Sequence, residues 1–331
     1  MKHHFGDLLG RDGDYWTIVP NREKYAYRIG DVRGNDPDIT IVTIGKDDEH
    51  WQRVLTLPNL EELTLHEPSP EQLEGVGALR RLRRLRITHA RPKNLTFMAG
   101  MESVEELVLE YVSGCDDLLP LSHLKRLRSL HVENLRQVAS FAGLSGLGSL
   151  QYLAIHGTLD WLQPIADFEF LRGLANLEVL ALFQLKCLAA FPALLPALEL
   201  RHLENLRVSP NYLPAEECAL LEVGLPSIAD VQFGPYREFA VARMQVPADD
   251  IRARLPEATV RANHPEVAIW HDGRRMIDDP DSLTVYFTGR GAGQVKRSSK
   301  TMEARCQAYA ARYEEMKSRA RAVIENARTR V

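Results

Sequence analysis

A leucine spacing that recurs eight times constrains the fold of this chain more than any other feature. In the pattern L-x-x-L-x-x-L-x-L, the third apolar residue falls at eight positions: 63, 85, 107, 130, 153, 180, 206 and 231. Successive copies are 22 to 27 residues apart, and each copy has an apolar residue at all four pattern positions. Repeats of this length are typical of solenoids, in which each unit stacks on its neighbours.

The two halves of the repeat predict different local structures. The final L-x-L alternates with a period of two, which predicts a short strand with one face inward. The preceding leucines, three residues apart, favour a 3₁₀ or short helical return on the convex side. One unit cannot bury its leucines alone, so the strands must stack in a parallel sheet about 4.8 Å apart. The predicted fold is an α/β solenoid with a curved sheet, an exposed concave face and a C-terminal α-helix.

The pattern resembles the leucine-rich-repeat family, specifically its short class with repeats of roughly 22 residues. Bacterial internalins and the leucine-rich regulatory subunit of protein phosphatase 1 belong to this class, and the segment DLLPLSHL (117–124) is similar to the internalin connector. The resemblance covers about residues 36–290 and implies a binding scaffold without naming a partner. The sequence departs from the family at its turns, where only Asn211 occupies the usual Asn or Cys position. The other turns are therefore expected to satisfy their backbone groups differently.

The sequence divides into four expected segments. Residues 1–36 form an N-terminal cap, with a possible hairpin lying over the first rung and made of residues 15–19 and 25–29. Residues 37–234 form the solenoid, and residues 235–290 form degenerate repeats and a C-terminal cap. In this cap, 258–263 still fits the strand and turn of the repeat, a hairpin is expected at Asp272-Gly273, and 283–287 is expected to be a last rung.

Residues 291–331 are expected to form a flexible, Gly-rich basic linker followed by an amphipathic helix over 298–328. The helix carries apolar residues in steps of four and three: Met302, Cys306, Tyr309, Tyr313, Met316, Ala320, Val323 and Ala327. This stripe can pack on the end of the solenoid, or bind a partner or a second copy of the chain. Residues 294–331 hold ten Lys or Arg against four Glu, so an anionic surface is a third alternative.

Composition and motifs argue against several classes of function. A net charge of −4 gives no basic signature for nucleic acid, and no apolar run approaches the roughly 20 residues that span a bilayer. The four dispersed cysteines form no CxxC motif, which favours reduced thiols in a cytoplasmic protein. No catalytic motif has the required context, so we expect no enzymatic activity, no cofactor and no metal site.

The concave face is predicted to carry the functional residues. Repeats two and three contribute the charged side chains Arg84, Arg86, Glu106 and Glu110, which are flanked by Glu62 in an alternating row. Repeats five and six contribute an apolar patch rimmed by polar side chains: Tyr152, Val179 and Phe183, with His131, Glu133 and His156. The alternatives are a row of solvated ion pairs and an apolar patch covered by the chain's own C-terminal segment.

These features predict a non-enzymatic module that binds a protein partner on its concave face. An inhibitor or immunity-type protein that blocks a toxin or an enzyme is one concrete form of this hypothesis. The alternatives are a scaffold that self-associates through the C-terminal helix and a regulatory module of an enzyme complex. Neither nucleic acid nor a membrane is expected as a partner.

Overall fold

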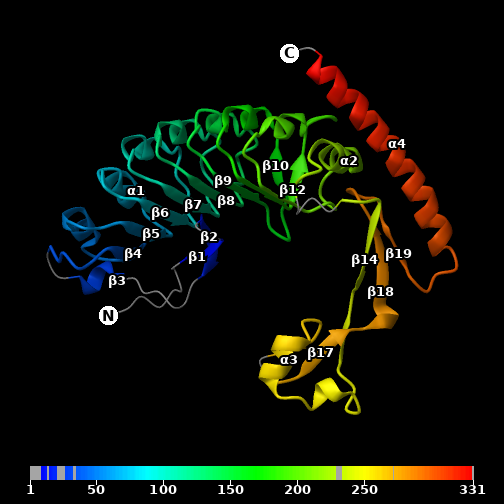
Figure 1. Cartoon of the computed structure of the whole chain (residues 1–331). Helices are drawn as coiled ribbons and strands as arrows, with labels where there is room; N and C mark the ends of the chain where they lie inside the picture. Colours follow the sequence, from blue (N-terminus) through cyan, green and yellow to red (C-terminus); the bar gives the residue numbers. More distant parts are fainter. Residues whose placement is uncertain are drawn as a thin grey trace.

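The computed structural model describes residues 9–12, 15–20, 27–32, 35–228, 233–270 and 272–329. Its main feature is a curved parallel sheet of nine strands, which form the inner face of an arc (Figure 1). Their order along the arc follows the chain: β3 (Tyr27–Arg28), β4 (Ile41–Gly45), β5 (Glu62–His66), β6 (Arg84–Thr88), β7 (Glu106–Glu110), β8 (Ser129–Glu133), β9 (Tyr152–His156), β11 (Val179–Phe183) and β13 (Asn205–Val208).

The repeat leucines align from strand to strand. Leu63 of β5 pairs with Leu85 of β6, which pairs with Leu107 of β7, and the same register continues along the sheet. These three side chains have no exposed surface. The predicted α/β leucine-rich-repeat solenoid is confirmed for the first seven repeats. In the eighth, Leu225 and Ile228 are buried in the same core, whereas Val231 lies outside the described residues.

The convex side returns mostly through 3₁₀ helices, as the leucine spacing predicts. They are η1 (Ile29–Asp31), η2 (Trp51–Thr56), η3 (Thr96–Gly100), η4 (Leu119–His123), η5 (Ala142–Leu144), η6 (Glu169–Gly173) and η7 (Leu195–Glu199). Two returns are α-helices, α1 (Pro70–Val76) and α2 (Ala215–Gly224). Helix α1 begins at a capping box in which Ser69 and Gln72 exchange side-chain and backbone hydrogen bonds.

The turns after the strands satisfy their backbone groups without the usual Asn residues. The residue that follows each of five strands adopts the left-handed backbone conformation, with positive φ: Glu67, His89, Tyr111, Asn134 and Gln184. In the first four, the amide donates to the last carbonyl of the next strand, as Glu67 N does to Thr88 O at 2.9 Å. Neighbouring rungs therefore supply one another's hydrogen-bond partners at these turns.

The longer connectors after β9 and β11 form a second, small parallel sheet, with β10 (Gln163–Ile165) beside β12 (Leu185–Cys187). The buried Gln163 side chain accepts from Leu135 N at 2.9 Å and donates to Val138 O at 2.7 Å. The extra residues of these repeats thus build a polar link between connectors.

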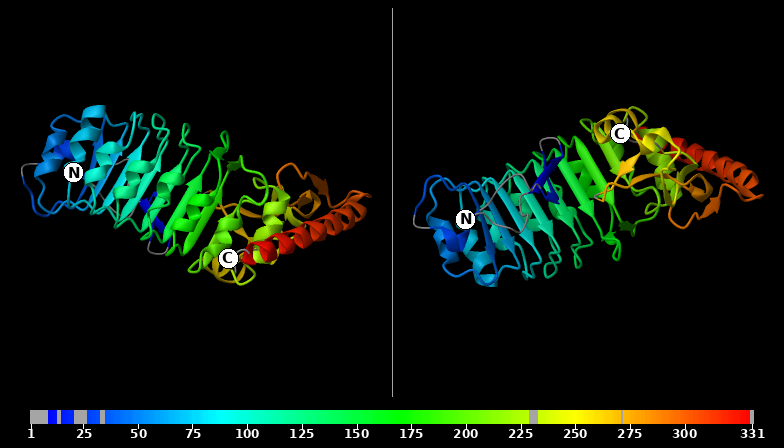
Figure 2. Two further views of the ribbon diagram at one scale, coloured as in Figure 1. Left: turned by 90° about the horizontal axis from the view of Figure 1, so that it is seen from above. Right: turned by 90° about the horizontal axis from the view of Figure 1, so that it is seen from below.

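The N-terminal hairpin differs from the prediction in both pairing and place. It consists of β1 (Leu9–Asp12) and β2 (Tyr15–Pro20), and β3 instead extends the parallel sheet beside β4. Strand β2 lies against β7 and β8, in the middle of the concave side and not over the first rung (Figures 1 and 2). The expected pairing of 15–19 with 25–29 is therefore wrong.

Residues 235–290 do not continue the solenoid, contrary to prediction. We call residues 236–287 the arm, because they project from the end of the arc (Figure 1). Strand β14 (Tyr236–Ala240) pairs antiparallel with β18 (Leu283–Phe287), so 283–287 is a strand but not a rung. Beyond this ribbon lies a lobe made of β15 (Arg243–Gln245), η8 (Ile251–Ala253), α3 (Glu257–Asn263), β16 (Ala268–Ile269), β17 (Arg275–Asp278) and η9 (Pro280–Ser282).

The lobe and the segment after it agree with the sequence prediction only in part. The hairpin expected at Asp272-Gly273 is confirmed as β16 paired with β17. Segment 258–263, expected to keep the strand and turn of the repeat, is helical because Pro256 precedes the first turn and Val260 buries its side chain in the small core of the lobe. The segment expected to be a flexible linker forms β19 (Gln294–Lys296), which pairs with β18 through a turn with positive φ at Gly289, Gly291 and Gly293.

The C-terminal helix, α4 (Met302–Arg328), starts four residues later than predicted because Arg297 and Ser299 belong to the turn after β19. It packs against α2 at the end of the solenoid (Figure 1). Tyr313 donates from its hydroxyl to Glu222 at 3.0 Å, and Ala320 and Ile324 join the main core. The apolar stripe of the helix is thus largely used within the chain.

Candidate functional site on the concave face

The four charged residues predicted from repeats two and three lie together and pair with one another or with neighbouring rungs. Arg84 contacts Glu62 at 2.5 Å and Glu106 at 3.3 Å, and Glu106 also pairs with Arg128. Arg86 contacts Glu110 at 2.8 Å. We call the row Glu62, Arg84, Glu106 and Arg128 the inner ladder. Its middle carboxylate, Glu106, is only 1% exposed, so this row is a partly buried structural network and not a solvated face.

A second row of ion pairs lies beside the inner ladder, and its arginines are more exposed. In this outer ladder, Arg83 contacts Glu105 at 2.8 Å, and Arg126 contacts the same carboxylate at 2.8 Å. The hydrogen bond from Arg83 lowers the pKa of Glu105. Because Arg83 and Arg126 remain largely solvated, these pairs contribute little to stability.

The predicted apolar patch is less accessible than expected. Tyr152 of β9 is 3% exposed, and Ala154 and Ala181 beside it are buried, whereas Val179 and Phe183 are half-buried. The concave side chains of β7 and β8 are also buried, and β2 lies against these two strands. The prediction of an open patch centred on Tyr152 is therefore wrong. The segment that lies against the middle of the face is the N-terminal hairpin, and not the C-terminal segment that was the alternative.

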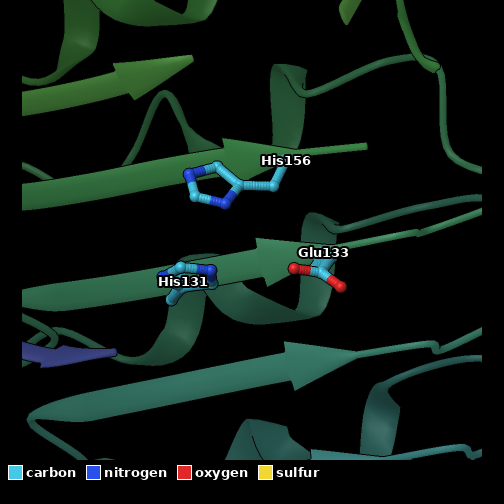
Figure 3. Close-up of side chains that lie close together, drawn as sticks. All are labelled: His131, Glu133 and His156. Carbon is cyan, nitrogen blue, oxygen red and sulfur yellow. The ribbon is translucent and has the colours of Figure 1, made fainter. Parts of the chain in front are cut away.

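The three polar residues predicted to rim the patch form a cluster of their own (Figure 3). His131 and Glu133 project from the same face of β8, two residues apart, and His156 projects from β9, where it pairs in register with Glu133. The two imidazole rings meet edge to face, with centroids 4.6 Å apart. Phe183 packs against His156 on the other side at 4.9 Å.

His131 is buried and His156 is half-buried, and ring nitrogens of both lack hydrogen-bond partners. Within the described part of the chain, neither ring nitrogen of His131 has a partner, and Nε2 of His156 has none. Each buried unsatisfied polar atom of this kind costs about 1–3 kcal/mol. Burial lowers the pKa of His131 well below its usual value and that of His156 to about 4, so both rings are neutral at pH 7.

Glu133 is perturbed in the opposite direction. Burial and the neighbouring Glu110 carboxylate raise its pKa to about 7, against the lowering effect of a hydrogen bond with Tyr111. The ligand atoms of His131, Glu133 and His156 all lie within 4.8 Å of one another, a set that could hold a metal ion. Linear motifs gave no indication of this cluster, although Glu133 and His156 occupy the same repeat column 23 residues apart.

The arm is a second candidate surface, which sequence reasoning missed. Of the ten large apolar side chains that are exposed among the described residues, six belong to the arm: Tyr236, Phe239, Val241, Met244, Ile251 and Trp270. Phe239 stacks on Tyr286 with ring centroids 4.6 Å apart while remaining 44% exposed. The sequence of β14, YREFA, has no clean alternation, and four of its five side chains are exposed.

Several solved leucine-rich-repeat structures align with part of this chain. An internalin (InlF) of Listeria monocytogenes aligns with a TM-score of 0.41 and 16% identity, over 58% of this chain and 52% of that one. The repeated leucines and the parallel register of the sheet make the fold a leucine-rich-repeat solenoid. Internalin C2 of the same organism aligns with a TM-score of 0.37 and 23% identity, over 47% and 67% of the two chains. A leucine-rich-repeat protein of Leptospira interrogans gives a TM-score of 0.37 at 14% identity, over 58% and 54%.

The chain spans about half the length of the internalin InlF, and the likeness concerns the fold alone. No protein-family model matches the sequence, and no curated protein is significantly similar to it. Among the described helices, none has the length and apolar character needed to cross a membrane.

Proposed function

We propose that this chain is a non-enzymatic protein-binding module that contacts its partner mainly through the arm. The observation that carries the proposal is the concentration of exposed large apolar side chains on the arm, away from the main core. Exposed apolar surface of this kind marks an interaction site, and aromatic residues are frequent anchors of protein interfaces.

The charges of the arm support a protein partner in preference to a polyanion. Residues 236–287 contain seven Arg and nine Asp or Glu, and no Lys. Many of these charges neutralise one another locally, as Arg252 does with Asp250 at 2.6 Å and with Glu266 at 3.0 Å. No field of one sign is left to attract nucleic acid or a charged membrane, so apolar contact supplies the affinity.

The concave face contributes less to partner binding than the arm does. Val179 and Phe183 remain half-buried at the apolar patch, next to His156, and can extend an interface that begins elsewhere. The inner ladder and the separate Arg86–Glu110 pair are already formed within the chain, so Arg84, Arg86, Glu106 and Glu110 would orient a partner only weakly. Occlusion of a partner's active surface, as in an inhibitor or immunity-type protein, is the form of action we propose for such binding.

The cytoplasm is the compartment we propose for this activity. All four cysteines are free thiols, and three of them are buried. Small secreted domains usually pair their cysteines, whereas reducing compartments keep them as thiols.

Position-specific photocrosslinking in the source cells tests the arm assignment. A photoreactive amino acid placed at Phe239 or at Trp270 is expected to trap one discrete protein, which mass spectrometry then identifies. The matched control is Leu119, which is 60% exposed on the convex side. Crosslinks of equal yield at all three positions, or no discrete product from the two arm positions, would contradict the proposal.

A series of variants then distinguishes the contribution of the arm to binding from that of the concave face. We expect Phe239→Ser combined with Val241→Ser to abolish binding of the identified partner with little loss of stability, because both side chains are already exposed. Phe183→Ser should weaken binding modestly. A product with twice the mass of the chain would show that the partner is a second copy, and binding lost only in Phe183→Ser would place the interface on the concave face instead.

A further inference from the structure

We propose that His131, Glu133 and His156 form a binding site for a zinc-class divalent metal ion on the concave face of the solenoid. The three side chains come from two adjacent strands, β8 and β9, whose register is fixed by the leucines beneath them. The site includes no residue of the arm.

The geometry of the cluster is close to that of a bound metal. Zinc ligands lie about 2.0–2.1 Å from the ion, which in a tetrahedral site places them about 3.4 Å apart. Here the ligand atoms lie within 4.8 Å of one another, so a closing movement of at most about 1.4 Å completes the arrangement. Rotation of the side chains supplies this movement without a change in the strands.

The buried, unpartnered nitrogens point to a missing ligand. Native proteins rarely bury polar atoms without a partner, and each exception requires a physical cause. His131 is 2% exposed, and both of its ring nitrogens lack a partner among the described residues, as does Nε2 of His156. A metal ion bound between the rings would give each histidine the electron-pair acceptor that the protein does not provide.

The surroundings suit metal binding in other ways. Tyr111 hydrogen bonds with Glu133 and can orient its carboxylate, as groups behind metal ligands commonly do. Val108 and Ala154, which pair in register with His131 on the two neighbouring strands, are buried.

The donor set selects the class of metal. Two imidazole nitrogens and one carboxylate oxygen suit zinc and its transition-metal neighbours, whereas calcium and magnesium prefer oxygen ligands alone. Three protein ligands leave a fourth tetrahedral position for water or another group. Because the ligands join two neighbouring rungs, we expect the ion to brace the sheet at its centre.

Isothermal titration calorimetry of the untagged, metal-free full chain with zinc chloride tests the proposal. We expect one ion per chain, with no comparable binding of magnesium or calcium, and tetrahedral visible absorption bands when cobalt replaces zinc. Glu133→Gln and His156→Gln should each weaken zinc binding at least about 10-fold. Glu133→Gln removes a buried charge, so it should fold at least as stably as the wild type without metal.

Two control variants separate this cluster from the histidines elsewhere in the chain. His89→Gln alters a histidine that lies outside the cluster, and it should bind zinc as the wild type does. His3→Ala combined with His4→Ala removes the histidine pair near the N-terminus and should also leave one-to-one binding intact. Absence of zinc binding at micromolar concentration, equal binding by the Glu133→Gln and wild-type proteins, or loss of binding in the His3 and His4 variant would overturn the proposal.

Discussion

The inner ladder allows a quantitative test of how burial changes the contribution of an ion pair to the free energy of unfolding. Replacement of Arg84 by Met keeps the side-chain length but removes the positive charge between Glu62 and Glu106. These two carboxylates have side-chain exposures of 8% and 1%, and Arg84 itself is 17% exposed. Removal of one partner of a fully buried pair costs about 3–5 kcal/mol, because the remaining charge is left uncompensated.

The expected cost for Arg84→Met is somewhat lower. Arg128 still pairs with Glu106, and Arg84 is not completely buried, so we expect a loss of about 2–3 kcal/mol in the free energy of unfolding. Arg83→Met in the outer ladder is the matched control. Arg83 is 44% exposed, so its loss should cost no more than about 1 kcal/mol.

Urea denaturation followed by far-ultraviolet circular dichroism measures the free energy of unfolding of both variants. The values are compared only where the dependence of the free energy on urea concentration is the same for variant and wild type. In 1 M salt the cost of Arg83→Met should shrink, whereas that of Arg84→Met should change little. Addition of Glu106→Gln should recover part of the loss in Arg84→Met, since the uncompensated charge is then removed. Equal losses for the two arginines, or a loss below about 1 kcal/mol for Arg84→Met, would refute the reasoning.

Three further outcomes are expected from the core and the C-terminal end. Leu130→Ala in the fully buried leucine row should cost about 3–4 kcal/mol in denaturant unfolding, whereas Leu119→Ala, 60% exposed, should stay within about 0.5 kcal/mol of wild type. Burial raises the pKa of Glu217 above 4.5, so its contribution is fully present below that pH and is lost as pH rises through the folded-state pKa. The stability of wild type relative to Glu217→Gln should therefore be greater at pH 4.5 than at pH 8, and a reversed order would contradict this sign. Tyr313→Phe should lose about 1 kcal/mol through the missing hydrogen bond to Glu222, measured by thermal unfolding, and an unchanged value would mean that α4 is not held by this contact.

The solenoid could be predicted in detail because its cause is local and repeated. Each L-x-L fixes which face of a strand is apolar, and the spacing of the repeats fixes which leucine lies beside which. The inner ladder follows from the same register, since Arg84 must neighbour Glu62 and Glu106 once Leu85 pairs with its equivalents. The sequence therefore placed the charged residues correctly.

Burial on the concave face could not be predicted in this way. His131 lies on the outward face of β8, where the repeat alone predicts exposure. Its burial depends on what lies across the sheet, including β2, which is more than 100 residues away in sequence. No local pattern reports such a contact, so the burial of side chains on the concave face of β8 could not be predicted from the repeat.

The arm could not be predicted from the sequence, for a different reason. Strand β18 has the composition of a rung, but its partner β14 is antiparallel and lies more than 40 residues earlier. A strand pattern does not specify its partner or direction. The helix α4 was predicted well because its stripe is periodic, although the stripe ends at Ile324 and not Val323, as a period of 3.6 residues requires.

The left-handed residues after the strands are positions at which substitution can raise the stability of this chain. Glu67, Tyr111 and Gln184 adopt φ values of 49° to 54°, where a residue with a side chain costs about 1–2 kcal/mol. Asn and Gly tolerate this conformation more easily, and Asn134 already occupies one such turn. Substitution of Glu67 or Gln184 by Asn or Gly should therefore stabilise the chain, whereas the same change at Tyr111 would also remove the hydrogen bond to Glu133.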